Sequence, residues 1–360
     1  MSRRFLLTGK NSTTIAPIAS IIQSIQEIEI TIPISSSSAT ATISSVNTAN
    51  TIILYNGIRG GDTDVSPATN FISLAITNST TITATTFQNN TSFSRTICAT
   101  VIEFVSTAVV SVQTGTIAVT GTSGTATIST VNTARSAVIF GGEIDSQTAQ
   151  QYGRVVGSLT LTNNTTVMCT REAASGTLTV RYFVIEFSSS VINSIQQTNI
   201  TIPISSSSAT ATISNVNTAN CLLLYGGWSL GLALSTSEAD MPYAKLTNGT
   251  TVTAIRTSSN ATATSIITAT VVEFKAQIIK TRQTGQTAIA NASGTNVAIS
   301  GVNTNKTAIS WLGQTYDTDG TPFNAMFATA KLTTSTNLSI DRGASIANTL
   351  IISWEIVEFY

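Results

Sequence analysis

The stretch ITIPISSSSATATIS occupies residues 30–44 and recurs, letter for letter, at residues 200–214. Its first part alternates isoleucine with polar residues, a period of two that is typical of a strand with one apolar face. Pro33 and Pro203 place that strand at a sheet edge or at the end of its pairing, because proline cannot donate to the ladder. The serine run predicts a turn, and the Ala-Thr alternation predicts a second strand.

Two short motifs extend this repetition to the whole chain. Both recur about every 85 residues: Val-Asn-Thr at Val46, Val131, Val216 and Val302, and Glu-Phe at Glu103, Glu186, Glu273 and Glu358. The first and third copies share the quoted stretch, whereas the second and fourth share Gln-Thr-Gly at Gln113 and Gln283, which gives an A-B-A-B order. The predicted organisation is an N-terminal arm at 1–23 and repeats at 24–105, 106–189, 190–276 and 277–360.

Each repeat is predicted to be all-β. Six or seven short strands in each unit, with no sustained 3.6-residue period, predict four tandem antiparallel β-sandwiches, Ig-like or jelly-roll-like in shape. A β-solenoid is the alternative for such a Thr-rich sequence, but its rungs would repeat over shorter periods than any found within the unit.

Composition excludes several function classes. Charged residues make up 9% of the chain, the net charge is zero and histidine is absent. A nucleic-acid partner would need a clustered basic surface. Without histidine, Ser-His-Asp and Cys-His catalysis is excluded, and no phosphate-binding glycine motif is present. We therefore expect no enzyme activity and no cofactor.

Targeting signals are also missing from the sequence. The longest apolar run near the start is Phe5 to Leu7, too short for a signal-peptide core, and no stretch is long enough for a membrane helix. We therefore expect synthesis in a cytoplasm and no membrane insertion. Three cysteines fall one to a repeat and are expected to be buried apolar residues: Cys98, Cys169 and Cys221.

The repeated glutamates suggest a structural pairing. Arginine ends the preceding strand in three copies, at Arg171, Arg256 and Arg342, while Thr86 stands there in the first. We expect cross-strand Glu–Arg pairs, worth about 0.2–1 kcal/mol each.

Calcium is a weaker possibility. Asp-x-Asp occurs in the same loop of two repeats and supplies hard oxygen ligands, although a full calcium loop is missing. The candidate ligands are Asp62, Asp64, Asp317 and Asp319. A solvated turn is the simpler interpretation.

Recognition is expected in the loop after the central strand, which differs most among the copies. These loops are 58–70, 143–157, 228–243 and 314–329, and their aromatic residues could bind sugars or pack against a neighbouring subunit: Trp228, Tyr243, Tyr316, Phe323 and Tyr152. The basic residues Arg3, Arg4 and Lys10 mark the N-terminal arm as an attachment segment.

The motif set resembles a repeat of bacteriophage virion structural proteins. The matching residues in the third copy are Ser194–Gln196, Ala209–Ile213, Val216–Thr218, Leu222–Gly227, Leu246–Arg256 and Val271–Phe274. The first copy lacks the arginine, and the fourth departs from the pattern between Leu332 and Arg342.

The resemblance implies a non-enzymatic virion protein, either a capsid decoration protein or a head or tail fibre component. Its partners would be other virion proteins and copies of itself, with a host-surface glycan as a further candidate. The alternative is a bacterial surface adhesin or an extracellular filament subunit that binds glycans, but such a protein should carry a secretion signal.

Overall fold

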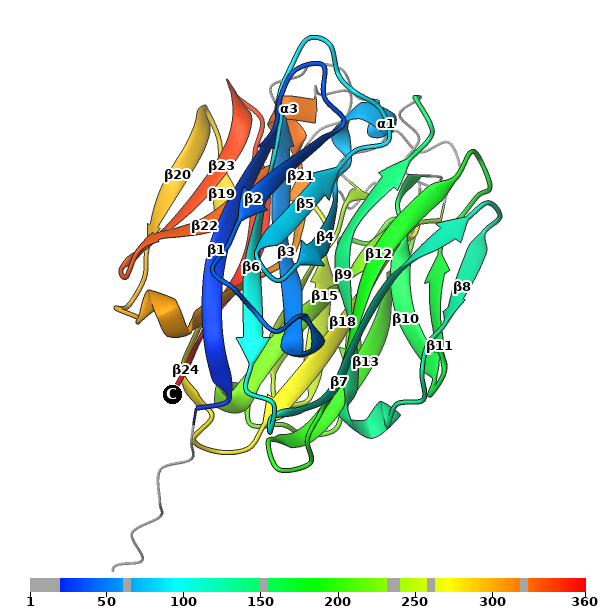
Figure 1. Ribbon diagram of the computed structural model, residues 1–360. Coiled ribbons are helices and arrows are strands. Elements are labelled where there is room, and N and C mark those ends of the chain that lie inside the picture. Colours follow the sequence, from blue (N-terminus) through cyan, green and yellow to red (C-terminus); the bar gives the residue numbers. More distant parts are fainter. Residues whose placement is uncertain (1–19, 61–65, 149–154, 232–239, 258–262, 318–322) are drawn as a thin grey trace, which may run out of the picture.

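A computed structural model describes residues 20–60, 66–148, 155–231, 240–257, 263–317 and 323–360 (Figure 1). The chain is all-β and is built from four similar repeats, as the sequence predicts. Within these ranges, no helix is both long enough and apolar enough to cross a bilayer.

The first two repeats have the same order of six strands. The first contains β1 (Ile22–Ile32), β2 (Ser38–Thr42), the 3-10 turn η1 (Thr48–Asn50), β3 (Thr51–Gly60), helix α1 (Pro67–Asn70), β4 (Ser73–Asn78), β5 (Thr81–Thr85) and β6 (Arg95–Phe104). The second contains β7 (Val109–Val119), β8 (Ser123–Thr127), η2 (Thr133–Arg135), β9 (Ser136–Asp145), β10 (Ser158–Asn163), β11 (Thr166–Thr170) and β12 (Leu178–Phe187).

The last two repeats keep that order. The third contains β13 (Ile192–Ile202), β14 (Ser208–Thr212), η3 (Thr218–Asn220), β15 (Cys221–Leu230), β16 (Tyr243–Asn248), β17 (Thr251–Ile255) and β18 (Ser265–Phe274). The fourth contains β19 (Ile279–Ile289), β20 (Ala292–Ala298), η5 (Thr304–Lys306), β21 (Thr307–Tyr316), helix α3 (Phe323–Met326), β22 (Ala328–Thr334), β23 (Asn337–Ile346) and β24 (Leu350–Phe359).

Strand pairing joins the repeats into a closed ring of four six-stranded sheets. Their orders are β2-β5-β4-β9-β12-β7, β13-β18-β15-β10-β11-β8, β14-β17-β16-β21-β24-β19 and β1-β6-β3-β22-β23-β20. Each sheet takes three strands from one repeat and three from the next, and the fourth repeat pairs with the first. Each repeat thus divides its strands between two sheets, which differs from four sandwiches that pair their strands independently.

The two halves of each sheet meet at one paired position. We call these meeting points the 1–2, 2–3, 3–4 and 4–1 junctions, after the repeats that they join. The paired residues are Ser73 with Gly142, Ser158 with Gly227, Tyr243 with Gly313, and Thr329 with Gly57. All four glycines have positive φ, between 89° and 100°, a region that favours glycine.

Burial follows from the position of each strand in its sheet. The edge strands β2, β8 and β14 alternate exposed and half-buried residues, whereas β6, β15 and β21 are buried along their whole length. The inner strands are therefore nearly continuous apolar runs, as expected for strands covered on both faces. The buried apolar residues of all four repeats form one continuous cluster.

Aromatic residues close the centre of the ring. Tyr55, Phe140, Tyr225 and Trp311 come one from each of β3, β9, β15 and β21, and each contacts two of the others edge-to-face, with ring centroids 5.0–5.4 Å apart. Phe104, Phe187, Phe274 and Phe359 continue the packing at 5.5–5.8 Å. Such pairs add about 0.5–1.5 kcal/mol each beyond burial, so the centre holds the four repeats together.

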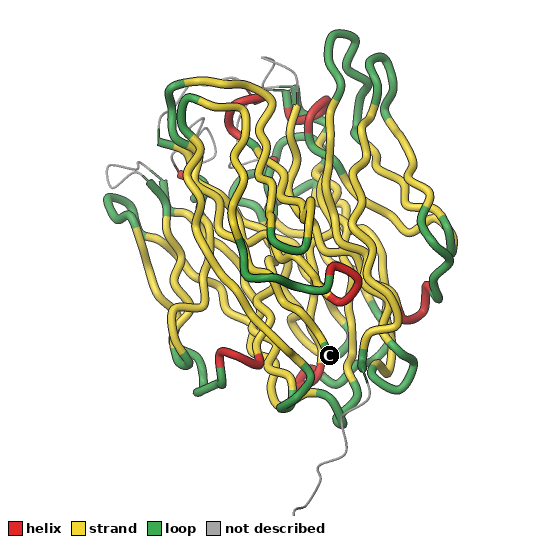
Figure 2. The backbone as a smooth tube through the Cα atoms, turned by 90° about the vertical axis from the view of Figure 1, so that its left-hand side faces the viewer, coloured by secondary structure: helices red, strands yellow, loops and turns green. Residues whose placement is uncertain are grey.

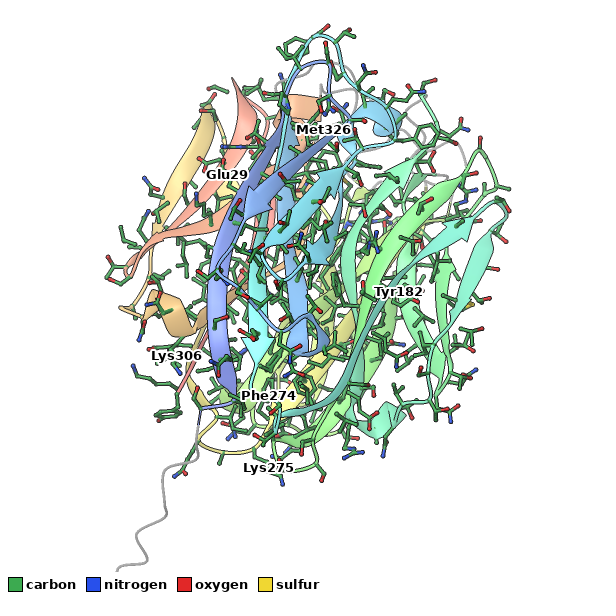
Figure 3. All side chains as sticks on the ribbon, in the orientation of Figure 1. Glu29, Tyr182, Phe274, Lys275, Lys306 and Met326 are labelled. Atoms are coloured by element: carbon green, nitrogen blue, oxygen red, sulfur yellow. The ribbon has the colours of Figure 1, made fainter. Side chains whose placement is uncertain are left out.

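The ring has two distinct ends. Helices α1 and α3 lie at the upper end in Figure 1, and the C-terminus lies at the lower end. The side view in Figure 2 shows short helical segments at both ends, with the strands running between them. In Figure 3, Met326 of α3 lies at the upper end, while Phe274, Lys275 and Lys306 lie near the lower one.

Candidate functional site

Three of the five predicted recognition aromatics lie in strands and are buried, which corrects their predicted placement in loops. Trp228 lies in β15, Tyr243 begins β16 and Tyr316 ends β21, and each is at most 7% exposed. The central strands run further into the predicted variable loops than expected: β15 extends to Leu230 and β21 to Tyr316. The residues in these extensions are buried. Phe323 begins α3, and Tyr152 lies outside the described residues.

Trp228 faces a small cavity at the centre of the ring. This cavity of about 20 Å³ is lined by the four central aromatics and by Phe71, Phe327 and Glu143, among others. Such a volume suits a single water molecule. The Glu143 carboxylate accepts a hydrogen bond from the Gly157 amide at 3.1 Å, and burial raises its pKa well above the ordinary value. The cavity is too small for an organic ligand.

Calcium binding at the predicted aspartates stays a prediction. Asp62, Asp64 and Asp319 lie outside the described residues, and Asp317 uses its carboxylate to accept the Thr349 amide at 2.8 Å. The described residues include no group of three or more carboxylate, cysteine or histidine side chains suited to a metal. Arg3, Arg4 and Lys10 of the arm also lie outside them.

The expected cross-strand Glu–Arg pairs were wrong, because the strand that carries or precedes the arginine lies in a different sheet from the strand that carries the glutamate. Glu103 and Glu273 instead accept the backbone amides of Asn47 and Asn217, both at 2.8 Å. The asparagine side chain in turn caps the 3-10 turn that follows it. Glu186 pairs with Arg135, and Glu358 with Lys280. The repeated Val-Asn-Thr and Glu-Phe motifs therefore fix the turn before each central strand.

Three buried arginines, Arg171, Arg256 and Arg342, bind backbone carbonyls from more than one segment of their repeats. The Arg256 guanidinium donates to the carbonyls of Pro203, Ser206 and Ala263 and pairs with Asp240 at 3.1 Å. Arg171 donates to three loop carbonyls, and Arg342 donates to the carbonyls of Ala292 at the start of β20, Ile346 at the end of β23, and Asn348. Each of these arginines ties separate segments together.

The first repeat fills the missing arginine position from another strand. Arg95 begins β6, is fully buried, and donates to the Ser36 carbonyl at 2.8 Å and to Thr86 Oγ1 at 3.2 Å. Thr86 is the residue that stands where the other copies have arginine. Sequence comparison of the repeats did not find this replacement, because Arg95 occupies a different register position.

The cysteines are buried in strands, as predicted. Cys98, Cys169 and Cys221 lie in β6, β11 and β15, and none forms a disulfide. Burial raises the pKa of Cys98 and Cys221 to about 12 and raises that of Cys169 further. These thiols are therefore protonated and poorly nucleophilic at neutral pH.

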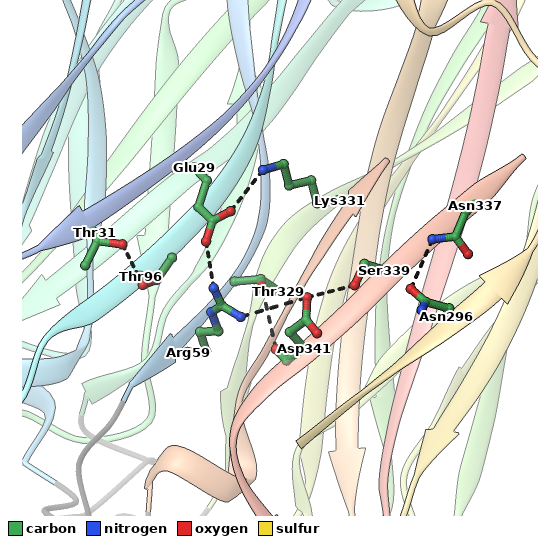
Figure 4. Close-up of polar contacts among 10 residues, drawn as sticks. All are labelled: Glu29, Thr31, Arg59, Thr96, Asn296, Thr329, Lys331, Asn337, Ser339 and Asp341. Carbon is green, nitrogen blue, oxygen red and sulfur yellow. Dashed lines mark hydrogen bonds and ion pairs between the residues drawn. The ribbon is translucent and has the colours of Figure 1, made fainter. Parts of the chain in front are cut away.

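An ion-pair cluster crosses the 4–1 junction (Figure 4). The Glu29 carboxylate on β1 accepts from Arg59 on β3 at 2.6 Å and from Lys331 on β22 at 3.0 Å. Arg59 also lies 3.8 Å from Asp341 on β23. Ion pairs therefore connect the first and fourth repeats, in addition to the backbone pairing of β3 with β22.

The 3–4 junction contains a polar pocket. Its volume is about 240 Å³, and its walls come from β16, β19, β21 and β24: Lys245, Leu246, Thr247, Arg282, Thr284, Gly285, Gln286, Leu312, Ser353, Trp354 and Glu355. Arg282 donates to Glu355 at 2.5 Å, and the other Glu355 oxygen accepts the Leu223 amide at 3.1 Å. The candidate functional site is therefore a polar hollow shared by two repeats.

Comparison with known proteins does not assign the chain to a family. No family model matches the chain, and no curated protein matches it. One structural similarity is to the atomic structure of Sulfolobus Turreted Icosahedral Virus, at 11% identity and a TM-score of 0.16, over 69% of this chain and 90% of that one. Another is to the triple jelly roll fold and turret assembly of an archaeal virus, at 10% identity and a TM-score of 0.18, over 94% and 90%. These scores are too low to assign a shared fold.

Proposed function

We propose that the chain is a non-enzymatic structural protein of a virus particle, of the bacteriophage type. It decorates a capsid or forms part of a head or tail fibre, and it assembles with copies of itself and with other virion proteins. The N-terminal arm is its attachment segment. Within the ring, we further propose that the two three-stranded halves of each repeat face each other as a sandwich.

The observation that carries this proposal is a duplicated exposed apolar residue. Ile34 and Ile204 are 53% and 55% exposed and occupy the same position in the two identical stretches. The next residues, Ser35 and Ser205, have φ of 62° and 61°, so the two turns share one backbone shape. Because the A repeats alternate around the ring, the molecule presents two equivalent apolar contacts on opposite repeats.

The sheet edges support assembly as well. Strands β2 and β14 both have the sequence SATAT, which carries no charge, and each ends its sheet. Edge strands without charge or proline readily accept a further strand from another chain. Equivalent edges on the two A repeats suit equivalent neighbours in a symmetric particle.

Localisation tests the proposal directly. Antibodies raised against residues 106–189 would be used to label particles from a lysate of the source, with gold detection by electron microscopy. Gold on the head supports decoration, and gold on the tail or on projecting threads supports a fibre. Label on cell surfaces and not on particles would refute the virion role and favour the adhesin.

The exposed isoleucines give a sharper test. The double variant I34E/I204E is expected to keep the melting temperature of the wild type but to lose incorporation into particles that lack the protein. The matched control is V110E, because Val110 is 58% exposed on a B repeat and has no place in the shared stretch. Equal incorporation of I34E/I204E and wild type would contradict the proposed contact.

A further inference from the structure

We propose that the 3–4 junction binds an acidic saccharide, with Lys245 and Arg282 holding its carboxylate. This inference does not depend on the proposed virion role. It comes from comparing the side chains at four junctions to which the repeats give equivalent strand pairings.

The pocket lysine, Lys245, has a counterpart at the 4–1 junction that does form an ion pair. Lys245 and Lys331 occupy the same position, each three residues before the last residue of β16 or β22. At the 4–1 junction, Lys331 pairs with Glu29. The residue equivalent to Glu29 at the 3–4 junction is Gln286, since each stands three residues after the repeated glutamine. Among the described residues, Lys245 forms no ion pair, so its charge faces the pocket uncompensated.

The other charges leave the pocket positive. Arg282 contributes a second cation, and its side chain is only 10% exposed. Glu355 is the one carboxylate among the lining residues, and both of its oxygens already accept hydrogen bonds, from Arg282 and from the Leu223 amide. With two cations and one engaged anion, the pocket favours a ligand with a negative charge.

The space for a ligand also arises from a substitution between repeats. At the 2–3 junction, Gln197 reaches across and accepts the Leu161 amide at 3.0 Å. The equivalent residue at the 3–4 junction is the shorter Thr284, which lines the pocket. The volume of about 240 Å³ is below the roughly 300–1,000 Å³ of pockets for drug-sized ligands, so it fits one ring-sized group.

The polar side chains that line the pocket, and a second hollow beside it, indicate that the anionic ligand is a saccharide. Thr247, Thr284 and Gln286 are exposed hydroxyl and amide side chains that can bind the hydroxyls of a sugar. A second, more open hollow of about 430 Å³ adjoins at Arg282 and continues to η3 and Lys280. The two hollows share Arg282, so a chain of two or more linked rings can follow the junction with a carboxylate beside Lys245.

Calorimetric titration of the full chain with digalacturonate tests the assignment. Saturable binding that weakens with added salt is expected, with no binding of the neutral galactose disaccharide. Acetate and phosphate serve as controls for a simple anion site. Equal binding of the neutral disaccharide, equal binding of acetate or phosphate, or no saturable binding of digalacturonate would each overturn the proposal.

Matched variants identify the site. K245Q should weaken digalacturonate binding by about tenfold or more, the loss expected for a charge-assisted contact. K331Q removes the equivalent lysine at the 4–1 junction and should leave affinity unchanged. Q286E should abolish binding by giving Lys245 the carboxylate partner that Lys331 already has, with no loss of melting temperature. Equal effects of K245Q and K331Q, or tight binding by Q286E, would refute the placement.

Discussion

Two glutamates on β1, Glu27 and Glu29, have side-chain pKa values shifted in opposite directions. Glu27 on β1 accepts from Thr100 Oγ1 at 2.5 Å through one oxygen, while its other oxygen is buried without a hydrogen-bond partner. Although the residue as a whole is half-buried, its carboxylate is shielded from water, and this desolvation raises its pKa from 4.5 to about 8. Glu29, two residues further on, has a lowered pKa because Lys331 and Arg59 stabilise its charge against the opposing effect of burial.

The raised pKa of Glu27 predicts a loss of stability with rising pH. Between about pH 4.5 and about pH 8 the folded chain keeps a proton that the unfolded chain releases, so folding weakens as pH rises through this window. The effect is at most about 1.4 kcal/mol for each pH unit. E27Q should remove this dependence and be more stable than wild type at the upper end. Urea unfolding at several pH values within the window measures the difference.

Glu29 provides the control with the opposite sign. Its folded pKa is lowered, so its contribution to stability is present above the ordinary pKa and disappears as pH falls through the folded value. E29Q should therefore be less stable than wild type at neutral pH and approach it in acid. A parallel pH dependence of E27Q and wild type would contradict the burial of the Glu27 carboxylate.

At the scale of elements, the junction glycines decide how two repeats share a sheet. Gly142 has φ of 94° and lies against the Ile72 carbonyl oxygen, which a Cβ atom there would strike. G142A should weaken the 1–2 junction through both backbone strain and this clash. We expect a loss of about 1–3 kcal/mol in unfolding free energy from the strained backbone alone.

Gly121 is the matched control for this substitution. It precedes β8, and a Cβ atom built there would meet nothing within 4 Å. G121A should therefore leave stability nearly unchanged, and denaturant unfolding of the two variants measures the contrast. A G142A protein as stable as G121A would mean that the junction does not need the positive φ.

The whole molecule is a closed ring in which the first and fourth repeats are paired without being consecutive in the chain. Lys306 donates to Ser20 Oγ at 2.7 Å and to the Tyr360 carbonyl at 3.3 Å, so the start of the first repeat lies near the end of the fourth. Closure of the ring by β3 and β22 uses the same pairing as the three internal junctions. The ring should therefore tolerate new chain ends.

Circular permutation tests this closure. A variant that joins Tyr360 to Ser20 through a short flexible linker, and opens the chain between Ser189 and Ser190, should fold with the circular dichroism spectrum of residues 20–360. We expect one cooperative unfolding transition, because all four repeats share one apolar core. Two separated transitions, or an insoluble product, would contradict a ring in which the four junctions are equivalent.

The sequence by itself determined the repeats, their A-B-A-B order, the all-β class and the burial of the cysteines, because strand periodicity and turn residues are local properties. The buried Arg95, the burial of Trp228, Tyr243 and Tyr316, and the pocket around Lys245 depended on tertiary structure. An apolar pattern specifies which face of a strand is covered, but not which repeat supplies the neighbouring strand. Pairing β9 with β4, or β3 with β22, is a contact between different repeats, and only the closed ring satisfies all four such edges together.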